Sequence, residues 1–496
     1  MTDETLTEVN PNAYIDLDNE TEKKFRTRLI KLQEKIVGSK RPVIAVFCGV
    51  NGAGKDQVTE LLREWLNNKY LILKAYDRSE MKNSMQEFRR YWVDTPPESK
   101  LGLFVSSWYS NPLSAYAHDE CSEADFHAML DRINFFEKTL ADWGAIIVKF
   151  WLYMDKGEQE KYLNGISADP LESWRITSDD FANMELHDKF AEATQKIIKH
   201  TDKDYAKWHF IQEGNLTERI EKTLKELCSH LEDALEEKPS SKSKIELKEL
   251  IKEKGNASAP RFEKTDLSLS LPKDEYNQRL IELRARLNRQ FMQIKERGEK
   301  VITVFEGSDA SGKGGAITRM TSALNIHDFN IFPISAPTKE EADHHFLWRF
   351  WKAFNQQKLL TVFDRSWYGR VLVERVEKFT PENDWLRGYG EINYFEDLLV
   401  KEKNHLIKFL LCISEEEQLK RFKKREKTAY KEWKITDEDW RNRSKWNEYV
   451  VAFDDMLALC DNWYAPWILV SGNNKRYARI QVMESLSNYL EKILSA

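Results

Sequence analysis

The sequence predicts an α/β protein made of two tandem domains, each a parallel β-sheet flanked by helices. Two Gly-rich turns ending in Gly-Lys, at residues 49–55 and 307–313, follow apolar segments rich in β-formers. Matching residues recur at one nearly constant spacing through both halves. Apolar strands alternate with amphipathic helices, as in a parallel sheet covered on both faces. Duplication of a single domain accounts for all three observations.

The elements follow the same order in each copy, and the second copy shows them most clearly. An amphipathic helix opens it, because Tyr276, Leu280, Leu283 and Leu287 recur at helical spacing. A buried strand at 301–305 then leads into the Gly-rich turn and a helix. Later strands are predicted at 359–363, 405–413 and 467–470, and later helices near residues 415 and 477.

The repeat rests on rare residue types. Lys55 and Lys313 lie 258 positions apart, and the matches that follow keep an offset of 259. They include Trp108 and Trp367, Tyr109 and Tyr368, Glu137 and Glu396, Lys149 and Lys408, and Trp208 and Trp467. Turn-forming residues lie between the copies. We therefore expect one domain over 1–237, a linker over 238–262 and a second domain over 263–496.

Composition narrows the classes of function. The chain has 496 residues and a formal net charge of −6, which argues against a general nucleic-acid binder. The N-terminus does not resemble a signal peptide, and no apolar run is long enough to span a bilayer. Unpaired thiols are typical of a reducing cytoplasm. The cysteines are scattered without a CxxC pair, at Cys48, Cys121, Cys228, Cys412 and Cys460.

The second Gly-rich turn has the spacing of a phosphate-binding loop. Gly307 and Gly312 would let backbone N–H groups surround an anion, and Lys313 would neutralise its charge. Gly314, followed by Gly315, replaces the usual Ser or Thr that helps to hold Mg²⁺. Carboxylates must then bind the metal, and Asp309 and Asp364 are the candidates. The alternative is a Gly-rich turn that binds no ligand.

A second motif begins where the predicted strand at 359–363 ends, the edge at which open α/β sheets bind ligands. Asp364 could hold Mg²⁺ or orient an acceptor oxygen. Arg365 and Arg370 could pair with phosphate. The alternative for these charges is a surface ion pair. Trp367 and Tyr368 are interpreted as packing residues, since the first copy keeps both.

Dense positive charge follows at 420–427 and continues to Lys431 and Lys434. On a helix, Arg421, Lys424 and Arg425 share one face, where like charges repel. A bound polyanion would offset that repulsion, whereas the alternative is a solvated helix face. The first copy favours the polyanion, because the residues matching Arg421, Lys424, Arg425 and Lys431 are Tyr162, Gly165, Ile166 and Glu172.

Other charged residues could extend such a site. Lys475 and Arg476, in a run that ends at Arg479, follow the last strand and could reach the ligand or cap the closing helix. Arg349 and Lys339 are further anion candidates, whereas His344 and His345 are expected to be structural. The first copy again lacks the charges, because Asn51, Val105 and Ser106 match Asp309, Asp364 and Arg365.

Taken together, the second copy resembles the polyphosphate kinase type 2 family, in its fused two-domain polyphosphate:AMP phosphotransferase subgroup. The resemblance covers about 271–492, and the first copy resembles the family more faintly over about 26–232. The motifs that carry it are the loop from Gly307 to Gly315, Leu347-Trp-Arg349, the run from Asp364 to Val376, Glu391 to Glu396, Glu417 to Phe422, Trp433-Lys434, Ala465-Pro-Trp467 and Asn474 to Arg479.

The resemblance implies thymidylate-kinase-like P-loop domains and transfer of phosphoryl groups from inorganic polyphosphate to AMP, with Mg²⁺ as cofactor. Lys313 and the loop would hold the transferring phosphate. Asp309 and Asp364 would position Mg²⁺ and the acceptor, and Arg365, Arg421 and Arg425 would stabilise charge in the transition state. The first copy would be non-catalytic. The expected partners are polyphosphate and AMP or ADP, and a homodimer is compatible with this arrangement.

Two rival functions remain at this point. One is an ordinary ATP-dependent nucleotide kinase, against which the missing loop Ser or Thr and the long basic helix count. The other is a polyphosphate- or nucleotide-binding regulator without turnover, an interpretation that suits the first copy better than the second. A polyphosphate-dependent kinase of nucleoside diphosphates is the alternative within the family.

Overall fold

The computed structural model describes residues 17–76, 87–170, 173–212, 214–236, 261–354, 357–428 and 435–495. The expected linker, apart from its last two residues, and the candidates Lys431 and Lys434 lie outside this set. Contacts divide the chain into two compact units. The N-terminal unit comprises 1–240 and 339–348, and the C-terminal unit comprises 241–338 and 349–496.

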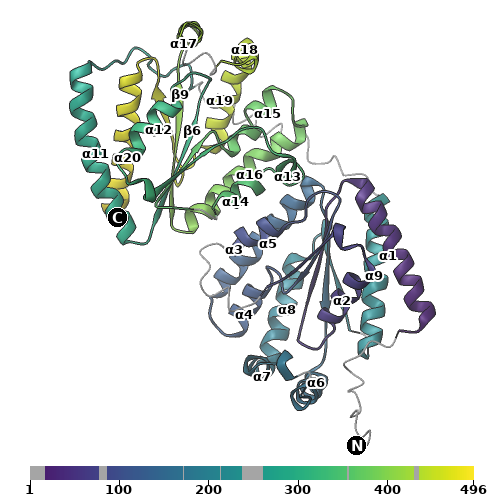
Figure 1. Ribbon diagram of the computed structural model, residues 1–496. Helices are drawn as coiled ribbons and strands as arrows, with labels where there is room; N and C mark the ends of the chain where they lie inside the picture. Colours follow the sequence, from purple (N-terminus) through teal and green to yellow (C-terminus); the bar gives the residue numbers. More distant parts are fainter. Residues whose placement is uncertain are drawn as a thin grey trace, which may run out of the picture. The chain divides into compact units, whose positions relative to one another are not determined.

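The N-terminal unit is a five-stranded parallel sheet with the order β2-β3-β1-β4-β5 (Figure 1). Helices α1, α2 and α9 pack on one face, and α4, α5 and α8 on the other. The bounds of the strands are Val43–Gly49, Leu71–Ala75, Leu101–Val105, Ile146–Leu152 and Ala206–Ile211. The α-helices are α1 Asn19–Ser39, α2 Lys55–Trp65, α3 Glu87–Asp94, α4 Ser110–Ala117, α5 Glu123–Trp143, α6 Lys156–Ala168, α7 Ser178–Glu185, α8 His187–Thr201 and α9 Leu216–Glu236.

The C-terminal unit repeats this topology, since its order β7-β8-β6-β9-β10 is equivalent to that of the first sheet. Helices α11, α12 and α20 cover one face, and α14, α16 and α19 lie on the other (Figure 1). The strands are β6 Lys300–Glu306, β7 Phe329–Pro333, β8 Leu360–Asp364, β9 Asn404–Cys412 and β10 Trp467–Ser471. The helices are α11 Lys273–Glu296, α12 Lys313–Thr321, α14 Trp348–Ala353, α15 Val373–Val376, α16 Glu382–Lys401, α17 Glu415–Glu426, α18 Asp437–Ser444, α19 Trp446–Cys460 and α20 Lys475–Ser495.

The predicted tandem α/β fold is confirmed, and the strands predicted in the second copy end within a residue of their observed limits. The strand β7 was not predicted. None of its residues is fully buried, and it ends in Pro333 at the edge of the sheet. An edge strand therefore lacks the continuous apolar run that identified the central ones.

His344 and His345 are buried, as their expected structural role requires. They lie in the segment 339–348, which includes α13 (Lys339–Ala342) and groups with the N-terminal unit. The His344 ring stacks on Trp348 with centroids 4.0 Å apart, and the His345 ring lies 5.2 Å from that of Trp92. Among the described residues, no cluster of three or more metal-binding side chains includes them.

All five cysteines are free, as the sequence predicts. In the part of the chain that the structure describes, no helix is both long and apolar enough to cross a membrane.

Candidate active site

The second Gly-rich turn connects β6 to α12 and has the backbone that a phosphate loop needs. Gly307 has a φ of +136°, and a Cβ there would lie 2.5 Å from the carbonyl oxygen of Leu411 on the neighbouring strand. Gly312 has a φ of +113° and caps the N-terminus of α12. Both positions therefore require glycine. The turn places the positive end of α12 beside the loop, where an anion would bind.

Lys313 is the first residue of α12, and its side chain folds back over the loop. Its Nζ donates to the carbonyl oxygen of Gly307 at 2.7 Å. Burial is the main reason that the pKa of Lys313 lies below its usual value. Arg365 lowers the pKa further, whereas Asp309, Asp364 and Glu306 act in the opposite direction. These four charged groups therefore surround the lysine.

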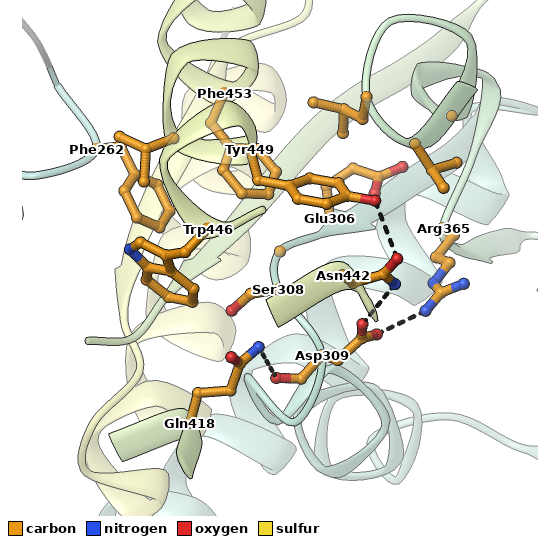
Figure 2. A pocket seen from close by; sticks show the side chains of 15 residues that line it. Phe262, Glu306, Ser308, Asp309, Arg365, Gln418, Asn442, Trp446, Tyr449 and Phe453 are labelled. Atoms are coloured by element: carbon orange, nitrogen blue, oxygen red, sulfur yellow. Dashed lines mark hydrogen bonds and ion pairs between the residues drawn. The ribbon is translucent and has the colours of Figure 1, made fainter. Parts of the chain in front are cut away.

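Asp309 lies at the centre of a hydrogen-bond network that joins the loop to the end of β8 and to the helices α17 and α18 (Figure 2). Arg365 Nη2 donates to Asp309 Oδ1 at 2.7 Å, and Asn442 Nδ2 donates to Oδ2 at 2.9 Å. Gln418 Nε2 donates to the Asp309 carbonyl oxygen at 3.1 Å. The carboxylate is thus oriented from both sides, by the residue that follows β8 and by α18.

Asp364 is the last residue of β8 and pairs in register with Phe305 of β6, one residue before Glu306. Its half-buried carboxylate makes no hydrogen bond with any residue that the structure describes. Arg365, which follows, has a left-handed backbone with a φ of +63° and donates its N–H to the Phe305 carbonyl oxygen at 3.0 Å. The predicted residues Asp309, Lys313, Asp364 and Arg365 are therefore brought together.

Two carboxylates beside a phosphate loop suit Mg²⁺, which is usually held by one or two carboxylates together with substrate phosphates. Asp309 and Asp364 provide hard oxygen ligands of this kind. Among the described residues, no group of three or more acidic, His or Cys side chains forms a preformed metal cage. The donor set therefore fits a metal ion that arrives with a phosphorylated substrate.

Glu306 is a site residue that the sequence analysis did not select. It is 5% exposed, lies immediately before Gly307, and accepts a hydrogen bond from Ser366 Oγ at 2.8 Å. Burial raises the pKa of Glu306, although Lys313 and Arg365 oppose this shift. The matching residue in the first copy is Cys48, whose thiol lies 3.8 Å from Ser107 Oγ. The lost charge at this position was the signal that could have identified Glu306.

Arg421 was expected to contact the transferring phosphate, but its side chain bonds to the protein instead. Its five N–H donors are all engaged by the protein, and the residue is 5% exposed. Nη1 donates to the carbonyl oxygens of Ala310 and Ser311 in the loop, each at 2.8 Å. Nη2 donates to Gly472 and Asn473, and Nε donates to Glu417. Arg421 therefore holds the loop.

A second arginine, Arg479 of α20, reaches the start of α12. A Cβ on Gly315 would lie 3.1 Å from Arg479 Nη2, so this glycine makes room for the guanidinium. Burial lowers the pKa of Arg421, and the charges of Arg425 and Arg479 lower it further. Three arginines thus gather at the loop. Arg425 is half-buried on α17, Lys424 is exposed there, and Lys431 lies outside the described residues.

The remaining candidates have protein partners. Arg370 Nη1 lies 2.8 Å from Thr380 Oγ1 and 3.1 Å from Glu374 Oε2. Arg349 donates to Ser335 O at 3.0 Å, and Arg476 donates to Leu271 O at 2.8 Å. Lys475 is exposed at the start of α20. At Gly314, an added Cβ would have no described atom within 4 Å. Arg370, whose side chain is 16% exposed, is thus held by Glu374 and Thr380 rather than by an aspartate on the surface.

A pocket opens beside the loop and has one charged wall and one aromatic wall (Figure 2). Glu306, Asp309 and Arg365 form the charged wall. The aromatic wall comes from α19 and from the segment before α11, with Phe262, Trp446, Tyr449 and Phe453. Tyr449 also donates from its hydroxyl group to Asn442 Oδ1 at 3.3 Å. Such a pocket can take a ligand with a flat apolar part and an anionic part.

Trp367 and Tyr368 do not belong to this pocket. They contact a fully buried ion pair between Lys408 and Glu396, in which Nζ lies 2.6 Å from Oε2. Trp367 Nε1 and Tyr368 OH both donate to Glu396 Oε1. The first copy contains the same arrangement, with Lys149, Glu137, Trp108 and Tyr109. Since both copies keep it, the interpretation of Trp367 and Tyr368 as packing residues is confirmed.

The first copy keeps the loop but lacks the charges around it. Lys55 Nζ donates to Gly49 O at 2.6 Å, as Lys313 does to Gly307, and burial lowers its pKa. Asn51 replaces Asp309 and donates to Asp180 rather than pairing with an arginine. The matching residues Ser106 and Arg365 both have left-handed backbones, so the turn is retained although the arginine is not.

Comparison with known proteins agrees with these observations. The family model described as polyphosphate kinase 2 (PPK2) matches the chain twice, over residues 14–239 and 270–494. The chain is 37% identical over 469 residues to a polyphosphate:AMP phosphotransferase from Pseudomonas aeruginosa, and the aligned region covers 94% of each protein. It is 34% identical over 221 residues to ADP-polyphosphate phosphotransferase 1 from Rhizobium meliloti, covering 45% of this chain and 74% of that protein.

A solved structure shares the whole architecture. It is a crystal structure of a Pseudomonas aeruginosa PA01 protein assigned to polyphosphate kinase 2, and it is 35% identical to this chain. The superposition has a TM-score of 0.81 and covers 97% of this chain and 98% of the other. Since the family model matches both copies and these relatives span nearly all of the sequence, the chain belongs to the polyphosphate kinase 2 family.

Proposed function

We propose that this chain transfers the terminal phosphoryl group of inorganic polyphosphate to AMP and so produces ADP, at the phosphate loop of the C-terminal unit. The observation that supports this site most directly is the set Asp309, Asp364 and Arg365 around Lys313. The first copy has the same loop and the same lysine but neutral residues in place of that set. The choice of donor and acceptor follows the polyphosphate:AMP phosphotransferases that match most of the chain.

In this reaction an oxygen of the AMP phosphate attacks the terminal phosphorus of polyphosphate. The bond from that phosphorus to its bridging oxygen breaks, and the shortened polyphosphate leaves as an anion. AMP needs no general base, since its phosphate is already largely ionised near neutral pH. The protein therefore acts mainly by positioning the reactants and by stabilising charge.

The side chains around the loop have distinct tasks in this proposal. Lys313 and the N–H groups of the loop hold the transferring phosphoryl group. Arg365, which Asp309 orients, stabilises charge on the equatorial oxygens. Asp309 and Asp364 would hold Mg²⁺, which supplies charge neutralisation on the phosphate oxygens when it is bound. Arg421 fixes the carbonyl groups of the loop and is a positioning residue.

The pocket beside the loop is the place that we assign to the acceptor nucleoside. Its aromatic wall, which includes Trp446, Tyr449 and Phe453, suits stacking with a nucleobase, while Arg365 lies where the acceptor phosphate would approach the loop. The polyphosphate chain would run along the cations outside the pocket. These include Arg425 and Arg479 together with Lys424 and Lys475.

A donor and acceptor panel tests the proposal. Purified protein is incubated with Mg²⁺ and either AMP plus polyphosphate, ADP plus polyphosphate, or AMP plus ATP, and the products are separated. We expect ADP to form from AMP only when polyphosphate is present. ADP formation with ATP alone as donor would identify an ordinary nucleotide kinase. ATP formation from ADP with no product from AMP would place the chain with the nucleoside-diphosphate kinases of the family.

A further inference from the structure

The N-terminal unit contains a cavity at the position that matches the pocket of the C-terminal unit. The two are lined by equivalent residues, since Asn51, Gln159 and Asn183 match Asp309, Gln418 and Asn442. The N-terminal cavity is the larger, at about 190 Å³ against about 70 Å³. Thr194 and Ala191 line it where the second copy has the larger Phe453 and Val450.

The chemistry of this lining differs from that of a phosphate site. Asp180 is its only charged residue, and both carboxylate oxygens of Asp180 already accept hydrogen bonds, from Asn51 and from Thr177. Among the described residues no lysine or arginine lines the cavity, but Lys55 Nζ lies 2.6 Å from Gly49 O and 3.5 Å from Asn51 Oδ1, and both of these residues belong to the lining. A phosphate group here would meet only Lys55, whose pKa is lowered by burial, and no counterpart of Arg365, since Ser106 takes its place. Aromatic side chains form much of the wall, at Trp151, Tyr153, His187, Phe190 and Phe210.

Gln159 supplies an independent indication of a polar ligand. It is 6% exposed, lines the cavity, and its side-chain amide makes no hydrogen bond with any residue that the structure describes. Its counterpart Gln418 donates to Asp309 O and accepts from Arg443, both at 3.1 Å. In the first copy Met184 replaces Arg443, so the amide of Gln159 has lost that partner. The amide of Gln159 is therefore available to a polar ligand in the cavity.

We propose that this cavity binds the base of an uncharged purine nucleoside, independently of the reaction in the C-terminal unit. The flat ring would pack against the aromatic wall, and its ring nitrogens or exocyclic amine would bond to the amide of Gln159, with the nearby Asn183 as a second amide. Because Ser106 replaces Arg365 here, we expect a phosphate group on the ligand to add little to binding.

Equilibrium dialysis of labelled adenosine against the full-length chain tests this assignment. Thr194→Phe introduces the side chain that the second copy carries at the matching position and fills the cavity. We expect it to remove one equivalent of adenosine bound per chain. Gln159→Leu keeps the volume but removes the amide, and we expect at least about a tenfold weaker affinity, in line with one lost hydrogen bond to a buried group. Thermal melting confirms that each variant is folded, and Gln159→Leu decides the matter if Thr194→Phe does not fold.

Two further arms identify the ligand class. Polyphosphate added as a competitor should leave the adenosine bound at this site unchanged, and AMP should bind there no more tightly than adenosine. Tighter binding of AMP that disappears in Lys55→Ala would show a phosphate site and overturn the proposal. Wild-type affinity for adenosine in Gln159→Leu, or no binding by the wild-type chain at millimolar adenosine, would overturn it as well.

Discussion

Arg421 contacts the phosphate loop with a full set of hydrogen bonds, yet it offers none to a substrate. The sequence could place this residue near the loop, because it lies on a basic helix after β9, but it could not show that the guanidinium faces four backbone carbonyl groups. A basic pattern is the same whether its members bind the ligand or the protein. Arg421 binds the protein because backbone carbonyl groups surround its guanidinium, and only the folded structure shows where those groups lie.

We expect Arg421→Ala to lower kcat for ADP formation by about 10²-fold, since a misplaced loop no longer aligns the phosphoryl group. The kcat of Arg421→Lys should lie between those of the wild-type chain and Arg421→Ala, because an ammonium group cannot make five directed hydrogen bonds. Amide hydrogen exchange at residues 308–313 should become faster in both variants. Lys420→Ala, which changes a 79% exposed side chain on the same helix, is the control. A fall in kcat with unchanged exchange would contradict the positioning role.

The buried carboxyl group of Glu306 should make the stability of the protein depend on pH. Because burial raises its pKa, its ionised form is disfavoured in the folded protein, and the resulting loss of stability appears as the pH rises above about 4.5. Glu306→Gln should therefore raise Tm at pH 7 to 8, with a gain that vanishes towards pH 4, while ADP formation falls. A variant with a lower Tm at pH 8 would show that the ion pairing of Glu306 outweighs its burial.

Among the secondary-structure elements, β4 with α5 and β9 with α16 carry the same buried ion pair in the two units. Each lysine also donates to a backbone carbonyl group, Lys149 to Thr201 and Lys408 to Cys460, each at 2.8 Å. The sequence repeat predicted which residues match but not that they bond to one another, since Glu396 and Lys408 lie on different elements. Central strands were predictable from their apolar runs, whereas the half-exposed edge strand β7 was not.

Removing one partner of the buried ion pair should strongly destabilise the unit that contains it. We expect Glu396→Ala to lower the unfolding free energy of the C-terminal unit by about 3–5 kcal/mol, because Lys408 would stay buried without a counter-charge. Chemical denaturation monitored by tryptophan fluorescence measures this change. The double variant Glu396→Leu with Lys408→Met serves as the control and should recover much of the loss. A loss of less than about 1 kcal/mol in Glu396→Ala would contradict the account.

The whole molecule is a duplicated domain in which one copy keeps the fold and the loop without the charged site. The repeat, the parallel sheets that follow from alternating elements, and the contrast between the copies were all predictable from sequence. The loss of charge at Asn51, Val105 and Ser106 directed attention to the second copy. The retained cavity of the first copy was not predictable, because its volume depends on how Thr194 and Ala191 pack.

We propose that the C-terminal loop alone performs the chemistry. The most direct measurement compares polyphosphate-dependent ADP formation by Lys313→Ala and Lys55→Ala, matched changes of the same residue in the two loops, with Asp364→Ala alongside. We predict a loss of about 10²-fold or more for Lys313→Ala and Asp364→Ala, as for removal of a transition-state donor, and nearly wild-type turnover for Lys55→Ala. Near-wild-type turnover in Lys313→Ala, or a comparable loss in folded Lys55→Ala, would contradict the account.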